Sequence, residues 1–287
     1  MGFAVFADGT ANLPKELLDG ITLLPCEYTA DGVSRVYTGD LESFDAHSYY
    51  EGLRNGLTIR TSLLNTQVFL THFAPILEKG RDVIYIAMSS GISGTYNAAR
   101  LAAQELMEQY RGRFVHIVDS LGCGFGNGLL AMLAAELNRQ GKGAEEASDI
   151  LDREVPHTCQ YFTVDDLNFL KRTGRVSGMT ARIGTMLNIK PILFGDSTGH
   201  IVSCEKVRGR RSSIEALALK YEEKHMKLKA PKVCISHGDC LNDAKELAAR
   251  VLRITPDADL TISMHEPFSG AHVGPGMLGL FFRGTER

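Results

Sequence analysis

The sequence lacks several features that mark common classes of protein. Its six cysteines form no C-x-x-C pair, and Cys234, His237 and Cys240 are too sparse for a zinc site, so no metal is expected. No apolar run approaches membrane-spanning length, and there is no internal repeat. The first residues carry neither a basic segment nor a cleavage-like pattern. These absences favour a cytoplasmic protein whose thiols are buried and reduced.

An excess of charge of one sign is also missing. Lys and Arg number 31 and Asp and Glu number 34, which gives a formal net charge of -3. This balance argues against a general affinity for nucleic acid, so we expect no nucleic-acid partner. The 287 residues, of which 44% are hydrophobic, are enough for one large or two ordinary domains with real cores.

The two halves of the chain differ in pattern. In the first half, apolar runs at 2–7, 83–88 and 114–118 alternate with helical stretches, which is typical of βα units on a parallel sheet. One of these helices is predicted over 66–78, with Thr66 as its N-cap. The second half has a hairpin turn at 195–199 and two helices, which indicates a mixed α/β domain. We therefore predict an α/β protein with domains over 1–155 and 156–287.

The most informative segment is S-S-G-I-S-G-T at 89–95. It follows the apolar run 83–88 and opens a helix, where unpaired N–H groups and the helix dipole favour an anion. Its glycines let a ligand approach the backbone closely. An ordinary capped turn explains one serine, but not three serines, a threonine and two glycines in seven positions. We therefore predict a site for a small anionic group and keep the capped turn as the alternative.

Four further groups of residues suit binding. Thr61 and Ser62 lie too far before residue 66 to cap its helix, and His272 precedes a G-P-G turn that would let backbone and imidazole contact a ligand together. The basic turn at 171–175 is either solvated or a clamp for a carboxylate or phosphate. A second basic group suits an acidic partner surface or a partner's nucleotide phosphates, with a solvated loop as the alternative; it comprises Lys206, Arg208, Arg210 and Arg211.

Two enzyme motifs nearly appear. Residues 91–95 resemble the G-x-S-x-G nucleophile elbow, but Thr95 replaces its last glycine. Because His272 follows Ser93 in the chain order of that fold, a small-molecule serine hydrolase remains an alternative, with Asp239 as the nearest third member. The glycines at 122 and 124 begin a dinucleotide fingerprint that position 127 breaks.

Together these segments resemble the DegV family, the fatty-acid-binding subunits of the bacterial fatty acid kinase. F-A-D-G-T-A-N-L-P at 6–14 is similar to the family's D-S-T-A-D-L-P start, and residues 89–96 are similar to S-S-x-L-S-G-T-Y. Matches to the T-S-Q-P-S loop, V-D-S, the long block, the E-K-V-R segment and the H-V-G-P-G segment keep the family order, at 61–65, 118–120, 164–193, 205–208 and 272–276. One departure stands out, because Q-P-S becomes Leu63-Leu64-Asn65 and removes a polar group and a rigid turn beside the head group.

The resemblance implies an N-terminal Rossmann-like parallel-sheet domain and a C-terminal mixed α/β domain with a lipid between them. It implies a long-chain fatty acid as ligand and no other cofactor, with the carboxylate near the hydroxyl loops and the chain in an apolar tunnel. The ligand-binding residues that it implies are Thr61, Ser62, Ser93, Gly94, Thr95, Arg172, His272 and Gly274.

The resemblance further implies that the chain alone is no enzyme. A separate ATP-dependent fatty acid kinase subunit would phosphorylate the bound carboxylate to an acyl-phosphate, and the basic group at 206–211 is the predicted contact for it. A transient contact with a membrane surface is compatible with this role. A ligand-sensing module without an enzymatic partner is a third alternative, beside the hydrolase.

Overall fold

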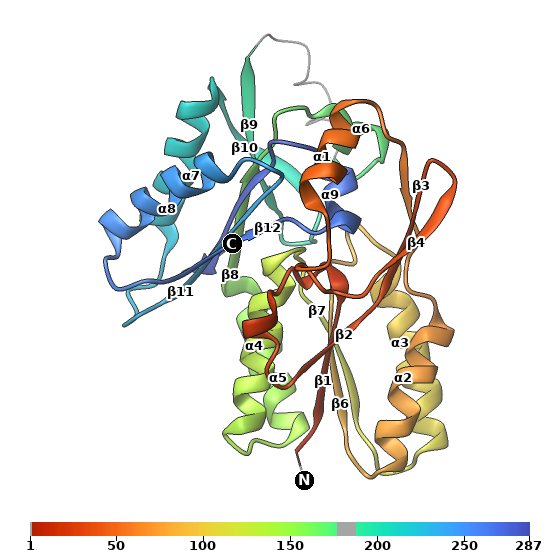
Figure 1. Ribbon diagram of the computed structural model, residues 1–287. Coiled ribbons are helices and arrows are strands. Elements are labelled where there is room, and N and C mark those ends of the chain that lie inside the picture. The colour runs from red at the N-terminus through yellow and green to blue at the C-terminus, as the bar shows by residue number, and fades with distance from the viewer. Residues whose placement is uncertain (1, 177–187) are drawn as a thin grey trace.

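Three β-sheets organise the protein. A computed structural model describes residues 2–176 and 188–287, so Leu187, which the family block includes, lies outside the described residues. The sheets are a four-stranded sheet, a six-stranded sheet and a three-stranded sheet. Figure 1 shows the four-stranded sheet with its helices in the lower part and the six-stranded sheet above it.

The four-stranded sheet is parallel, as the alternating pattern predicts. Its strands run in the order β2-β1-β6-β7, with β1 (Ala4–Asp8), β2 (Ile21–Leu24), β6 (Val83–Ala87) and β7 (Val115–Asp119). Two layers of helices enclose it: α2 (Thr66–Glu78) and α3 (Thr95–Gln109) on one side, α4 (Phe125–Arg139) and α5 (Ala144–Glu154) on the other (Figure 1). All five residues of β6 are buried, which explains why its apolar run does not alternate.

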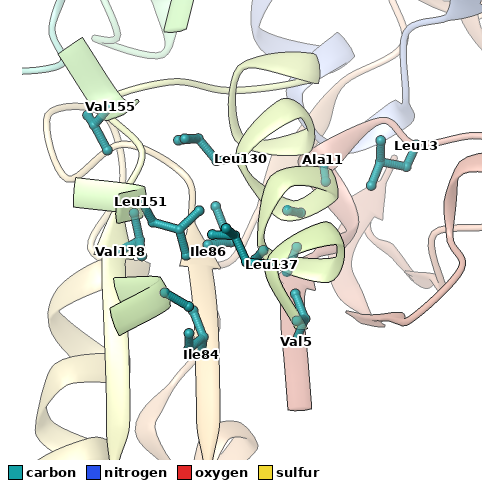
Figure 2. Packing of buried hydrophobic residues seen from close by; sticks show 14 of the residues in the cluster. Val5, Ala11, Leu13, Ile84, Ile86, Val118, Leu130, Leu137, Leu151 and Val155 are labelled. Carbon is teal, nitrogen blue, oxygen red and sulfur yellow. The ribbon is translucent and has the colours of Figure 1, made fainter. Parts of the chain in front are cut away.

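Each face of this sheet has its own core. Figure 2 shows the side that packs on α4 and α5, where the labelled strand and helix side chains include Val5, Ile84, Ile86, Val118, Leu130, Leu137 and Leu151. On the opposite face, Phe69 and Phe73 of α2 pack against Tyr85 with ring centroids 5.0 and 6.0 Å away. Successive strand residues therefore serve opposite faces. Helices therefore cover both faces of the sheet. The edge formed by the carboxyl ends of its strands is available to form a site.

The six-stranded sheet is mixed. Its order is β10-β9-β8-β13-β11-β12, with β8 (Thr158–Thr163), β9 (Ile189–Gly195), β10 (Ile201–Arg208), β11 (Lys232–His237), β12 (Asp259–Met264) and β13 (Leu278–Arg283). β9 and β10 form the predicted antiparallel hairpin, and β11 and β12 are parallel. The helices α7 (Arg210–Lys224) and α8 (Leu241–Ile254) pack on the sheet through a shared apolar core. The predicted boundary at 155/156 falls within the 3-10 helix Val155–His157.

The three-stranded sheet links the two halves of the chain. It contains β3 (Cys26–Ala30), β4 (Val33–Tyr37) and β5 (Ile59–Thr61), and α1 (Ala46–Arg54) packs with it. The phenol hydroxyls of Tyr49 and Tyr50 on α1 donate to the carbonyls of Pro267 and His265, at 2.6 and 2.9 Å. These carbonyls flank the start of α9 (Pro267–Val273). Residues of the first half thus brace the helix that carries His272.

One predicted cap is wrong. The side chain of Asn65 accepts a hydrogen bond from the Val68 amide at 3.2 Å, so Asn65 is the N-cap of α2 and Thr66 is its first helical residue. Asn and Thr both cap helices well, so residue type alone does not distinguish Asn65 from the adjacent Thr66. The side chain of Asp45 caps α1 by accepting a hydrogen bond from the Ser48 amide.

Candidate functional site

A cavity of about 380 Å³ lies where the two halves of the chain meet. Its walls come from the carboxyl ends of β6 and β7, from the six-stranded sheet, and from α9, which is the edge where ligands usually bind in open α/β sheets. The apolar part of the lining consists of Leu63, Met88, Ile92, Leu121, Phe162, Leu170, Ile201, Phe268, Val273, Met277 and Phe281. Such a lining suits an alkyl chain.

The open end of the cavity is marked by exposure. Leu63 and Gly94 are the exposed residues among its described lining, and Leu63 keeps 50% of its surface accessible. Beside them lie the polar residues that we call the mouth cluster, Thr61, Ser93, Arg175 and His272. No described lining residue is acidic. The entrance therefore combines hydroxyls with positive charge.

Strand alternation separates Thr61 from Ser62. Thr61 ends β5, where it pairs with Tyr28, and its hydroxyl oxygen lies 2.9 Å from Nε2 of His272. Ser62 is exposed, does not line the cavity, and donates its amide to the Glu27 carbonyl at 3.2 Å. Successive side chains leave a strand on opposite faces, so one predicted residue points inward and its neighbour outward.

The loop before α3 places Ser93 and Gly94 on the cavity. The Ser93 hydroxyl donates to the Thr95 hydroxyl oxygen at 3.0 Å and accepts the Thr95 amide at 3.2 Å. Thr95 itself is buried and its hydroxyl oxygen accepts the Leu64 amide at 3.3 Å. Thr95 therefore ties two loops together, and its amide is already paired.

His272 is held neutral. Burial, together with the nearby charge of Arg175, lowers its pKa to about 4. Its Nδ1 is buried without a partner in the described part of the chain. A buried unpaired N–H is rarer than an unpaired acceptor, so the proton is assigned to Nε2, which donates to Thr61. The Thr61 hydroxyl hydrogen is then free to be donated into the cavity.

Arg175, and not Arg172, lines the cavity. The guanidinium of Arg172 lies 4.6 Å from the centre of the Phe169 ring, and the residue is exposed. Gly274 is also outside the lining; it has a φ of 75°, and a Cβ there would lie 2.4 Å from the Phe169 ring. Gly274 therefore packs α9 closely against α6 (Asn168–Arg172), and a side chain at this position would separate the two helices.

Comparison with known proteins identifies the family. The model of the DegV family of uncharacterised proteins matches residues 2–285. The chain belongs to the DegV family. It is 32% identical to a DegV domain-containing protein of Clostridium perfringens over 99% of this chain and 98% of that protein. A DegV domain-containing protein of Lactococcus lactis is 30% identical over 98% of this chain and 97% of the relative.

Solved structures of DegV proteins share the two-domain fold. A fatty-acid-binding DegV protein of Bacillus subtilis is 28% identical, with a TM-score of 0.84 over 99% of this chain and 100% of that one. A Thermotoga maritima protein with fatty acid binding function is 27% identical, with a TM-score of 0.84 over 99% of each chain. The predicted family and fold class are thereby confirmed.

The DegV start motif supports the floor of the cavity. The buried Asp8 carboxylate accepts the amides of Thr10 and Met88, both at 3.1 Å, and the Tyr85 hydroxyl at 3.0 Å. Met88 lines the cavity directly after β6. Burial raises the pKa of Asp8, whereas these hydrogen bonds favour its charged form. The start motif therefore supports the cavity by fixing the position of the Met88 backbone.

A second polar group lies deep in the cavity wall. We call it the inner cluster: Ser236, His265, Glu266 and Ser269, all of them buried. Nε2 and Nδ1 of His265 lie 2.9 Å from the Ser269 hydroxyl and 3.2 Å from the Ser236 hydroxyl. Glu266 accepts the Ser269 hydroxyl and the Phe268 and Ser269 amides. Burial lowers the pKa of His265 to about 3 and raises that of Glu266 to about 7.

The four predicted partner-binding cations separate into two kinds. Lys206, Arg208 and Arg211 are exposed. Nε of Arg210 lies 2.9 Å from the Asp243 carboxylate, and its Nη2 donates to the Cys240 sulfur at 3.2 Å. Arg210 is therefore part of the packing between α7 and α8, whereas the other three side chains are exposed.

The predicted hydrolase arrangement is not assembled. Asp239 lies 2.6 Å from Arg54 and 3.3 Å from His47, so its carboxylate is engaged elsewhere. The Nδ1 of His272 has no carboxylate partner among the described residues, and its Nε2 contacts Thr61. A catalytic triad needs a histidine oriented by an acid toward the nucleophile. The serine hydrolase is therefore not supported.

The described residues contain neither a membrane-spanning helix nor a cluster of metal ligands. Within 2–176 and 188–287, no helix is both long and apolar enough to cross a bilayer. In the same ranges, no three His, Cys, Asp or Glu side chains are placed to hold a metal ion together.

Proposed function

We propose that the protein binds a long-chain fatty acid in the interdomain cavity and presents its carboxylate to a separate ATP-dependent kinase, without catalysing a reaction alone. The observation that carries this proposal is the cavity itself, with apolar walls and a cationic, hydroxyl-lined entrance whose described lining includes no acidic group. DegV relatives that bind fatty acids support the same ligand class.

The acyl chain supplies most of the affinity. Each methylene that is buried out of water contributes about 0.8 kcal/mol. Apolar lining residues such as Phe162, Phe268 and Met277 provide the surface against which the chain packs. The head group mainly fixes orientation. Thr61 offers a hydroxyl donor and Arg175 offers the positive charge, while the Ser93 hydroxyl, which also lines the entrance, donates to Thr95.

A carboxylate that must react suits this entrance, because Nη1 of Arg175 already donates to the Thr173 carbonyl, so that the guanidinium supplies charge without a tight bidentate pair, and the Thr61 hydroxyl adds a neutral donor. A carboxylate held in a tight pair with an arginine is a weaker nucleophile, whereas hydroxyl donors leave lone pairs available. In the proposed reaction a carboxylate oxygen attacks the γ-phosphorus of ATP, the acyl-phosphate forms, and ADP leaves. The low pKa of His272 keeps the imidazole neutral near pH 7 and so supports this environment.

The exposed cations give the kinase a surface to approach. Lys206, Arg208 and Arg211 lie on and after β10, and β10 also supplies Ile201 to the cavity. A positive surface steers an acidic partner and raises its association rate. We propose that these three residues contact the kinase.

Lipid extraction tests the binding step. Protein purified from cells is denatured, and its lipids are identified by mass spectrometry. We expect a long-chain fatty acid at near-stoichiometric occupancy. Protein that releases none, and that takes up neither added oleate nor added palmitate, would contradict the proposal.

A coupled assay tests the presentation step. Loaded protein is incubated with ATP and a fatty acid kinase subunit, and acyl-phosphate is trapped with hydroxylamine. We expect hydroxamate only when both proteins and ATP are present. Binding without any hydroxamate would favour the ligand-sensing alternative, and p-nitrophenyl ester hydrolysis that disappears in Ser93→Ala would revive the hydrolase.

A further inference from the structure

An apolar side chain stands at the polar entrance of the cavity. Leu63 lines the cavity and is 50% exposed, and the same lining includes the polar residues Thr61, Ser93 and Arg175. An exposed leucine is unremarkable on an ordinary surface. At a head-group site it occupies a position where a polar side chain would meet both the carboxylate and water.

The backbone around Leu63 is fixed on both sides. Before it, the Ser62 amide donates to the Glu27 carbonyl at 3.2 Å. After it, the Leu64 amide donates to the Thr95 hydroxyl at 3.3 Å, and the Leu64 side chain is buried. Asn65 then caps α2. The backbone at Leu63 is therefore held in place, and the part that can move is the Leu63 side chain. An exposed side chain exchanges rotamers quickly.

Gly94 makes room for this side chain. A Cβ on Gly94 would lie 3.0 Å from Cδ2 of Leu63, which is closer than an unstrained contact. Leu63 thus lies across the loop that carries Ser93 and opens α3. The leucine therefore reaches from the segment after β5 to the loop before α3, and both of these segments line the cavity entrance.

We propose that Leu63 is an apolar gate over the head group, which excludes water from the bound carboxylate and slows its release. This inference rests on the proposed fatty acid binding. With the gate closed, the carboxylate is desolvated and retained. With the side chain turned outward, the carboxylate is open to a phosphoryl donor.

Release kinetics test the gate. Protein loaded with carbon-13-carboxyl palmitate is mixed with excess delipidated serum albumin, and transfer is followed over time. Leu63→Ala removes the apolar contact of a half-buried leucine side chain, and this loss should speed palmitate release about three- to tenfold. Leu63→Met, which stays apolar, should remain near wild type. Leu101→Ala is the matched control, because Leu101 is 62% exposed on α3 and does not line the cavity.

The ligand's own titration separates gating from a structural role. Carbon-13 NMR of the labelled carboxyl across pH reports its pKa when bound. Desolvation raises a carboxylic acid's pKa, so Leu63→Gln and Leu63→Ala should lower the bound value relative to wild type, and Leu101→Ala should not.

The outcomes are distinguishable. If wild-type protein takes up no palmitate, the proposed function fails. If palmitate binds but Leu63 variants match wild type in release and in ligand pKa, or if Leu101→Ala changes both equally, the gate is overturned while binding stands.

Discussion

The mouth cluster lines the cavity entrance, whereas the inner cluster reaches the cavity only through His265 and Ser269, and the hydrogen bonds of the two clusters differ. In the inner cluster, each hydroxyl, imidazole nitrogen and carboxylate has a protein partner. In the mouth cluster, the Thr61 hydroxyl and the Arg175 guanidinium each keep at least one hydrogen that can be donated to a ligand. Polar residues that satisfy one another build the wall, whereas those with spare donors bind.

Of the changes that test the difference between the two clusters, removal of the Glu266 carboxylate should have the largest effect. Glu266→Ala leaves three buried donors unpaired at the start of α9, so we expect the free energy of unfolding to fall by about 3 kcal/mol. Urea unfolding at neutral pH measures it. Glu266→Gln keeps one acceptor oxygen and should lose less. A loss below about 1 kcal/mol in Glu266→Ala would mean that the inner cluster is not structural.

Acid should weaken the fold through His272. Its pKa is about 4 in the folded protein against an ordinary 6.5, so the unfolded chain binds a proton that the folded chain excludes. This stability is complete above pH 6.5 and is lost as the pH falls toward 4, by up to roughly 3 kcal/mol. Denaturant unfolding from pH 7 to pH 4 should show a steeper loss in wild type than in His272→Gln. Equal slopes would contradict the buried, neutral assignment.

Arg175 and Arg172 form a matched pair of cations. Arg175→Gln removes a charged donor from the cavity and should weaken palmitate binding about 10- to 100-fold. Arg172→Gln, which removes a cation stacked on Phe169, should change affinity little. Titration calorimetry compares the two. The reverse order of effects would move the head group away from Arg175.

Thr61 and Ser62 form the second matched pair. Thr61→Val removes the hydroxyl that links His272 to the cavity. The loss of one hydrogen bond, about 0.5–1.5 kcal/mol, should reduce acyl-phosphate formation two- to tenfold. Ser62→Ala should act like wild type, because Ser62 faces outward. The coupled hydroxamate assay measures both variants. Loss of activity in Ser62→Ala alone would reverse the assignment.

The sequence predicted the fold better than the site. The apolar run at 83–88 identified a doubly covered strand, and the family order of motifs identified both domains. For the site, the hydroxyl-rich loops pointed to Thr61 and Ser93, which both line the cavity, and their role in binding stays a prediction. Composition cannot say which of several adjacent side chains faces inward, so Ser62 and Arg172 were grouped with Thr61, and Arg175 was passed over within the same basic turn.

The inner cluster had no comparable signal. Its members come from β11 and from the start of α9, and only the fold brings Ser236 beside His265. Leu63 was noticed as a departure from the family motif, but its position over Gly94 depends on how the loops before α2 and α3 pack. Pairwise placement of loops is a tertiary property that local patterns do not encode.

The smallest expected effect concerns the partner surface. Arg208→Glu should slow association with a kinase subunit severalfold and raise its salt sensitivity, because long-range attraction mainly sets the association rate. Lys245→Glu is the matched control, since Lys245 is exposed on α8 and changes net charge equally. Arg210 is a poor probe, because its loss would leave Asp243 unpaired within the packing of α7 on α8. Surface plasmon resonance at two salt concentrations measures association, and mass spectrometry measures lipid content, which should stay unchanged. Lipid loss in Arg208→Glu with intact kinase binding would place this surface with the cavity and not with the partner.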